Sequence, residues 1–162
     1  MSSIITIAGI TGSVRTESSN KAALRLAPEL LPAHARLDLL AIEELTIEDI
    51  NERLQQADAI LIATPEYKGL LSRVLRSVLT QIAPESLAEK PAALLGIGKS
   101  NGEGREHAQL RLLLGELNAA VLDEHVYISA EQLNDEGTRQ QISALLETLT
   151  LRVQESSSVL TN

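Results

Sequence analysis

The fold is decided by the N-terminal stretch IITIAGITGSVRTESSN, residues 4–20. Its first seven residues are almost continuously apolar and rich in β-branched side chains, which is typical of a parallel strand covered on both faces. A polar loop follows, and a helix is predicted at 20–31, where Pro32 stops it. A strand, a loop and a helix in this order form the repeating unit of parallel α/β sheets.

The same alternation continues along the chain. Further strands are expected at 35–40, 59–64, 92–97 and 120–128, and further helices at 46–57, 71–82, 107–117 and 135–154. We therefore predict one α/β domain at 1–154, with three layers, a five-stranded parallel sheet and helices on both faces. Residues 155–162 are expected to be a disordered tail. Ligands of such sheets bind outside the carboxyl ends of the strands, so the loops after the first, third and fourth strands are the informative ones.

Composition excludes several classes of protein. The net charge of −8 argues against nucleic acid or anionic lipid as the main partner. The absence of cysteine excludes disulfides, thiolate metal sites and thiol nucleophiles, and His34, His107 and His125 lack metal-ligand spacing, so no metal site is predicted. The N-terminus does not read as a signal peptide, and no apolar run approaches the roughly 20 residues of a membrane span. We expect a soluble, cytoplasmic protein that does not bind membranes.

The loop at 9–20 has the chemistry of an anion site. It combines two glycines, five hydroxyl side chains, Arg15 and Asn20 at the start of a helix, where backbone N–H groups and hydroxyls bind phosphate. The alternative is an ordinary polar loop that caps the helix. It is neither a Walker A loop nor a dinucleotide-binding GxGxxG motif.

Two further loops would meet the first at the same edge. The segment at 64–69 (TPEYKG) carries Tyr67, one of only two aromatic residues in the chain, and could pack against a flat ring, or be a simple turn. The loop at 98–105 (GKSNGEGR) could lie flat against a ligand or be a flexible surface loop. Lys99 and Arg105 in it could attract phosphate groups of a ligand or be solvated charges.

Together these loops resemble the NADPH-dependent FMN reductase family. That family follows its first strand with G-S-x-R-x-x-S-x-N, which Gly12, Ser13, Arg15, Ser18 and Asn20 match in order. After its third strand it carries T-P-E-Y-N-G, matched here by Thr64, Pro65, Glu66, Tyr67 and Gly69, with Lys68 in place of the asparagine. The resemblance covers roughly residues 1–150. The connection at 41–46 is shorter than is usual in the family.

The resemblance implies a flavodoxin-like fold with strand order 2-1-3-4-5 and a bound FMN. Ser13, Arg15, Ser18 and Asn20 would hold the FMN phosphate, while Pro65, Glu66, Tyr67, Lys68, Gly69, Gly98, Gly102, Gly104 and Arg105 would border the flavin ring. NADPH or NADH would reduce the flavin, which would pass electrons to free flavin, quinone or another small acceptor. No side-chain catalyst is needed, because hydride transfer is the chemistry of the cofactor. The family also implies a homodimer or homotetramer.

Two alternatives stay open at this point. One is an electron carrier of the flavodoxin type, which binds FMN but is reduced by a partner protein. The other is a flavodoxin-like scaffold that has lost its cofactor and acts through protein contacts.

Overall fold

The computed structural model describes residues 4–11, 19–65, 73–98 and 105–160 of the chain. The strands are β1 (Ile5–Thr11), β2 (Ala35–Leu40), β3 (Ala59–Pro65), β4 (Pro91–Gly98) and β5 (Ala120–Ser129). The helices are α1 (Ser19–Leu30), α2 (Ile47–Gln56), α3 (Arg73–Gln81), α4 (Arg105–Glu116) and α5 (Glu136–Leu160). Two short 3-10 turns, η1 (Pro84–Ser86) and η2 (Ala130–Gln132), complete the described elements.

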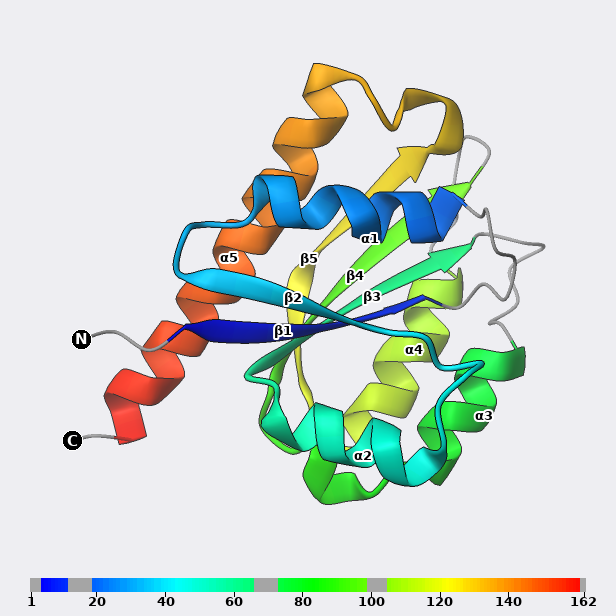
Figure 1. Ribbon diagram of the computed structural model, residues 1–162, viewed down its shortest axis with the longest axis vertical. Coiled ribbons are helices and arrows are strands. Elements are labelled where there is room, and N and C mark those ends of the chain that lie inside the picture. Colours follow the sequence, from blue (N-terminus) through cyan, green and yellow to red (C-terminus); the bar gives the residue numbers. More distant parts are fainter. Residues whose placement is uncertain (1–3, 12–18, 66–72, 99–104, 161–162) are drawn as a thin grey trace.

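The five strands form one parallel sheet in the order β2-β1-β3-β4-β5 (Figure 1). The chain starts in the interior of the sheet, adds β2 on one side, and then crosses β1 to place β3, β4 and β5 on the other. This reversal of direction puts the switch point between β1 and β3, where ligands of doubly wound sheets bind. The predicted fold class and strand order are confirmed.

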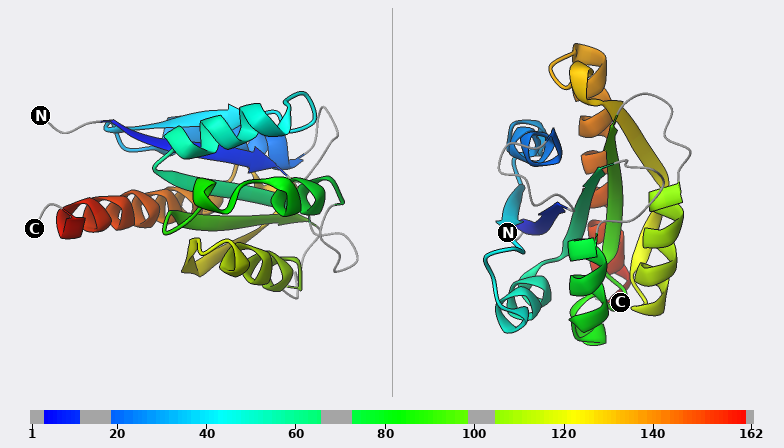
Figure 2. Two further views of the ribbon diagram at one scale, coloured as in Figure 1. Left: turned by 90° about the horizontal axis from the view of Figure 1, so that it is seen from below. Right: turned by 90° about the vertical axis from the view of Figure 1, so that its right-hand side faces the viewer.

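The sheet is covered on both faces, and the alternation of side chains along each strand divides the core in two (Figure 2). In β3, Ile60 and Ile62 face α2, α3 and α4, while Leu61 and Ala63 face α1 and α5. All four side chains are fully buried. A strand buried on both faces must be apolar at every position, which explains the uninterrupted aliphatic runs in the sequence.

Helix α2 shows how local sequence fixes an element. Thr46 is its N-cap, and the Thr46 side chain accepts a hydrogen bond from the Asp49 amide at 3.1 Å. Glu48 and Asp49 place negative charge in the first turn, where the helix dipole favours it. Ile50 and Leu54, one turn apart, are buried against the sheet. The sequence predicts this start, and the structure confirms it.

Helix α5 is longer than predicted. Residues 155–160, which we expected to be disordered, continue the helix to Leu160. No glycine or proline follows Gly137, and Val153 is still packed against the core at 7% exposure. The Ser156 hydroxyl donates to the Arg152 carbonyl at 3.1 Å, so this polar residue is satisfied inside the helix. A serine-rich composition is therefore compatible with helix here.

Candidate functional site

The carboxyl ends of β1, β3 and β4 define the candidate site. These strands are neighbours in the sheet, and they end at Thr11, Pro65 and Gly98. The register pairs Thr11 with Ala63 and Pro65 with Ile97, so the ends of neighbouring strands are level to within two residues. Neighbouring strands lie about 4.8 Å apart. The three loops that the sequence singles out therefore leave the sheet side by side, at one edge.

Three helices begin at this same edge, because each follows one of the three strands. They are α1, α3 and α4, which start at Ser19, Arg73 and Arg105. In Figure 1 the arrowheads of these strands point to the right, and α1 and α3 both have an end on that side. The positive ends of several helix dipoles thus gather where the loops leave.

The first turns of α1 and α3 differ from that of α2 in a way that fits an anionic ligand. Helix α2 also begins at the carboxyl edge, but Glu48, Asp49 and the Thr46 cap already supply negative charge and acceptors to its N-terminus. Helices α1 and α3 have no acidic residue in the first turn. A phosphate-bearing group such as FMN would meet no carboxylate on the first turns of α1 and α3. Ser13 and Ser18 of the sequence motif come before α1, and Asn20 lies in its first turn. The described first turns of α1 and α3 therefore fit an anionic group.

The structure places only part of the predicted site. Asn20 lies in the first turn of α1, Pro65 and Gly98 end β3 and β4, and Arg105 starts α4, so the backbone of all four is at the carboxyl edge. The other predicted residues lie outside the described part of the chain: Ser13, Arg15, Ser18, Glu66, Tyr67, Lys68, Gly69, Gly102 and Gly104. Their roles stay predictions.

The connection between β2 and α2 borders the site on the β1 side. It spans residues 41–46 and folds back on itself, with the Glu44 amide donating to the Ala41 carbonyl at 2.9 Å. Ile42 is buried and Leu45 packs against the core, so the apolar side chains of this turn serve the fold. The short connection is a compact turn of the domain.

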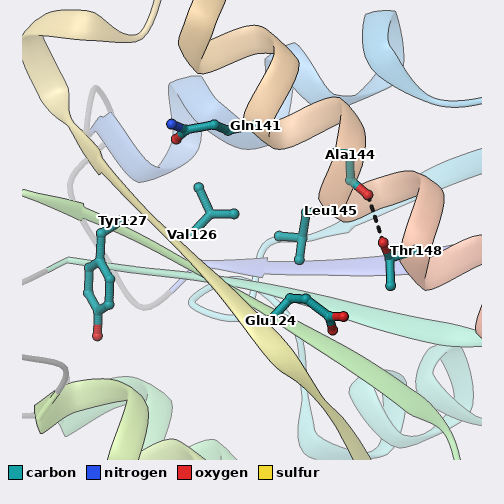
Figure 3. A pocket seen from close by; sticks show the side chains of 7 residues that line it. All are labelled: Glu124, Val126, Tyr127, Gln141, Ala144, Leu145 and Thr148. Carbon is teal, nitrogen blue, oxygen red and sulfur yellow. Dashed lines mark hydrogen bonds between the residues drawn. The ribbon is translucent and has the colours of Figure 1, made fainter.

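A groove of about 450 Å³ lies elsewhere, between β5 and α5 (Figure 3). It is lined by Glu124, Val126, Tyr127, Gln141, Ala144, Leu145 and Thr148. The Thr148 hydroxyl donates to the Ala144 carbonyl within α5 at 3.0 Å. The residues that line this groove belong to β5 and α5, and none of them belongs to β1, β3 or β4.

Sequence reasoning missed two arginines beside the site, Arg73 and Arg76 of α3. Both are exposed, and Arg76 Nη2 donates to Gln109 Oε1 of α4 at 2.9 Å. A signal was present, because no Asp or Glu occurs between Tyr67 and Pro84 in a chain that is acidic overall. Among the described residues, no group of three His, Asp or Glu side chains could hold a metal ion. No helix in the same part of the chain has the length and apolar character to cross a bilayer.

The strand order and the loop-built edge define a flavodoxin-like α/β protein, and comparison with solved structures agrees. An oxidoreductase from Corynebacterium diphtheriae superposes with a TM-score of 0.80 at 19% identity, covering 95% of this chain and 99% of that one. The flavoenzyme NAD(P)H:(acceptor) oxidoreductase FerB from Paracoccus denitrificans superposes with a TM-score of 0.79 at 20% identity, covering 94% of this chain and 98% of that one. At such identities the likeness concerns the fold.

The chain belongs to the NADPH-dependent FMN reductase family, whose model matches residues 5–133. The NAD(P)H-dependent FMN reductase PA1204 of Pseudomonas aeruginosa is 32% identical over 180 aligned residues, covering 94% of this chain and 97% of the relative. The FMN reductase (NADPH) of Escherichia coli is also 32% identical, over 124 residues, covering 75% of this chain and 61% of the relative. The resemblance seen in the sequence motifs is confirmed, and with it the assignment to an oxidoreductase family.

Proposed function

We propose that this protein is an NAD(P)H-dependent flavin oxidoreductase that holds FMN at the carboxyl edge of β1, β3 and β4. The observation that carries the proposal is the coincidence of the family match with this geometry. The matched residues 5–133 include all three strands, and the motif loops leave from adjacent strand ends. Relatives with related names include an NADPH:quinone oxidoreductase of Arabidopsis thaliana, 29% identical over 129 residues. We infer that the acceptor here is likewise a small molecule, such as free flavin or a quinone.

Different residues bind the two ends of FMN, the phosphate and the flavin ring. Ser13, Arg15, Ser18 and Asn20 bind the phosphate, aided by the N-terminus of α1, whose first turn lacks acidic residues. The loop at 65–69 and the residues Gly98, Gly102, Gly104 and Arg105 border the ring. When bound, FMN supplies the redox chemistry, taking a hydride from the nicotinamide and passing electrons to the acceptor. The protein binds and orients, so no acid, base or nucleophile needs to be present.

We place the protein in the cytoplasm and expect it to form a homodimer or homotetramer. Light scattering on the purified protein measures the assembly directly. A monomer at micromolar concentration, insensitive to FMN, would contradict this part of the proposal.

An anaerobic absorbance titration tests the function. The purified protein is mixed with stoichiometric FMN, and the flavin spectrum is recorded before and after NADPH is added. A perturbed spectrum that bleaches promptly is the expected result. A perturbed spectrum that stays oxidised would favour an electron carrier of the flavodoxin type, and an unperturbed spectrum would mean that the edge does not hold FMN.

A further inference from the structure

Among the residues that the structure describes, the carboxyl edge is divided by charge. At the end near α2 it carries exposed Glu43, Glu44, Glu48 and Asp49, and beyond β5 it carries exposed Glu131, Asp135 and Glu136. Helix α3, which starts between these two acidic regions, has no acidic residue at all. A ligand with several phosphate groups is therefore repelled from both ends of the edge and attracted to its middle.

Two arginines make that middle region positive. Arg73 is the first residue of α3 and Arg76 follows three positions later, so the two side chains lie on one face of the helix. Both are exposed. The bond from Arg76 to Gln109 ties its guanidinium to the neighbouring helix α4, seen beside α3 in the right-hand view of Figure 2. A guanidinium has five N–H donors, so one bond to an amide leaves donors for an anion while limiting the rotamers of the side chain.

We propose that Arg73 and Arg76 bind the 2′-phosphate of NADPH and give this protein a preference for NADPH over NADH. The inference rests on the proposed function, because it names the specificity of the same edge. The two dinucleotides differ only in that phosphate, a monoester that carries a charge of about −1.5 to −2 at pH 7. Two arginines one helical turn apart provide forked donors that match phosphate oxygens.

The position of α3 suits the adenosine half of the dinucleotide. Hydride transfer would require the nicotinamide to lie against the flavin, which we place at the ends of β1, β3 and β4, and α3 is the helix that follows β3. The N-terminus of α1 is assigned to the FMN phosphate, and Arg111 of α4 is engaged with the Asp123 carbonyl of β5 at 3.2 Å. Helix α3 therefore offers two exposed cations, Arg73 and Arg76, to a second phosphate-bearing molecule at this edge.

Calorimetric titration provides a readout that does not depend on turnover. The FMN-loaded protein and its Arg73→Gln/Arg76→Gln variant are titrated with adenosine 2′,5′-bisphosphate, and separately with adenosine 5′-monophosphate, which lacks the 2′-phosphate. The dissociation constant of the bisphosphate should rise about tenfold or more in the variant, as expected for lost hydrogen bonds to a charged group. The dissociation constant of adenosine 5′-monophosphate should change little. The ratio of kcat/KM for NADPH to that for NADH should fall in parallel with the bisphosphate affinity.

Two further variants sharpen the test. Arg152→Gln makes the same change in net charge on an exposed side chain of α5, at the opposite edge of the sheet, and should alter neither titration. Arg105→Gln tests the other arginine that the sequence offers for the dinucleotide. The proposal is overturned if the double variant binds the bisphosphate like the unaltered protein, if both nucleotides weaken equally, or if the NADPH preference depends on Arg105 instead. An unaltered protein that binds the bisphosphate but oxidises neither nicotinamide would contradict the proposed function and leave the role of the arginines intact.

Discussion

Thr6 and Asp58 exchange two hydrogen bonds at the amino-terminal edge of the sheet. The Thr6 amide donates to Asp58 Oδ2 at 2.9 Å, and the Asp58 amide donates to the Thr6 carbonyl at 2.8 Å. Asp58→Ala removes the side-chain acceptor at the start of β1 and should lower the free energy of unfolding by about 1–2 kcal/mol. Asp58→Asn keeps an oxygen acceptor, so its free energy of unfolding should fall less than that of Asp58→Ala. Urea denaturation measures both. Equal losses in both variants would contradict a hydrogen-bonding role.

Lys90 links pH to stability at the same edge. Burial lowers the pKa of Lys90 below the usual lysine value of about 10.4, and the nearby charge of Asp58 offsets part of this effect. In the pH window between the two values the unfolded chain binds more protons than the folded one, so the contribution of Lys90 to stability increases as pH rises through that window. Relative to Lys90→Met, the unaltered protein should therefore gain free energy of unfolding as pH approaches 10.4.

This comparison should be made at several pH values above 8, because all other titrating groups are common to both proteins. Asp58→Asn removes the charge that raises the pKa of Lys90 and should start the pH-dependent gain at a lower pH. A difference between the two proteins that stays constant with pH would show that Lys90 titrates normally. The Lys90 ammonium also donates to the Leu54 carbonyl at the end of α2, so Lys90→Met should cost some stability at every pH.

Arg53 and Asp38 join α2 to the edge strand β2. Arg53 Nε donates to Asp38 Oδ2 at 3.1 Å, and Arg53 Nη2 donates both to Asp38 Oδ1 and to the Leu39 carbonyl. The side chains are 33% and 27% exposed, so solvent screens the pair in part. Arg53→Met should cost about 1 kcal/mol, and Arg53→Lys should recover only part of it, because an ammonium cannot form the forked contact. A double-mutant cycle with Asp38→Asn measures the coupling, which should shrink at high salt.

Leu61 tests the two-faced core. It lies in the central strand β3 with no exposed surface, on the side of α1 and α5. Leu61→Ala should lower the free energy of unfolding by about 2–5 kcal/mol, because the cavity cannot close within the sheet. Leu151→Ala is the matched control on α5, since that side chain is 50% exposed, and it should stay within about 0.5 kcal/mol. Similar losses for both would contradict the assignment of the core.

Arg15 tests the proposed phosphate contact of FMN. Arg15→Gln should raise the dissociation constant of FMN by about tenfold or more, because a charged hydrogen-bond donor to the phosphate is lost. Quenching of flavin fluorescence on binding gives the constant directly. Arg25→Gln, an exposed residue further along α1, makes the same charge change and should have little effect. If the two variants weaken FMN equally, Arg15 acts only through long-range charge.

Much of this architecture could be predicted from local sequence. Aliphatic runs in the sequence predict the buried strands, and Thr46 followed by acidic residues predicts the start of α2. The bonds between Thr6 and Asp58 could not be predicted, since 52 positions separate the two residues and only the β1–β3 pairing brings them together. The end of α5 was missed because polarity at 155–160 indicates exposure but does not exclude a helix.

The candidate site is predicted from its loops, whereas the charge pattern around it is not. Sequence motifs identify residues that are uncommon at a given position in the chain, such as Gly12 and Arg15 in the loop after the first strand. Arg73 and Arg76 are ordinary residues of an amphipathic helix, and their interest arises only when topology places α3 between two acidic regions of the edge. Such a role depends on the arrangement of distant elements in space, which local patterns do not encode.

The parallel sheet and the antiparallel course of α5 have a practical consequence. β1 begins, and α5 ends, at the left of Figure 1, opposite the edge from which the three loops leave. An affinity tag, a fluorescent protein or a surface linker joined beyond β1 or α5 would be attached on the side of the molecule away from the edge where we propose that FMN binds. Immobilisation on an electrode or bead through either attachment would favour molecules that turn this edge toward the solution.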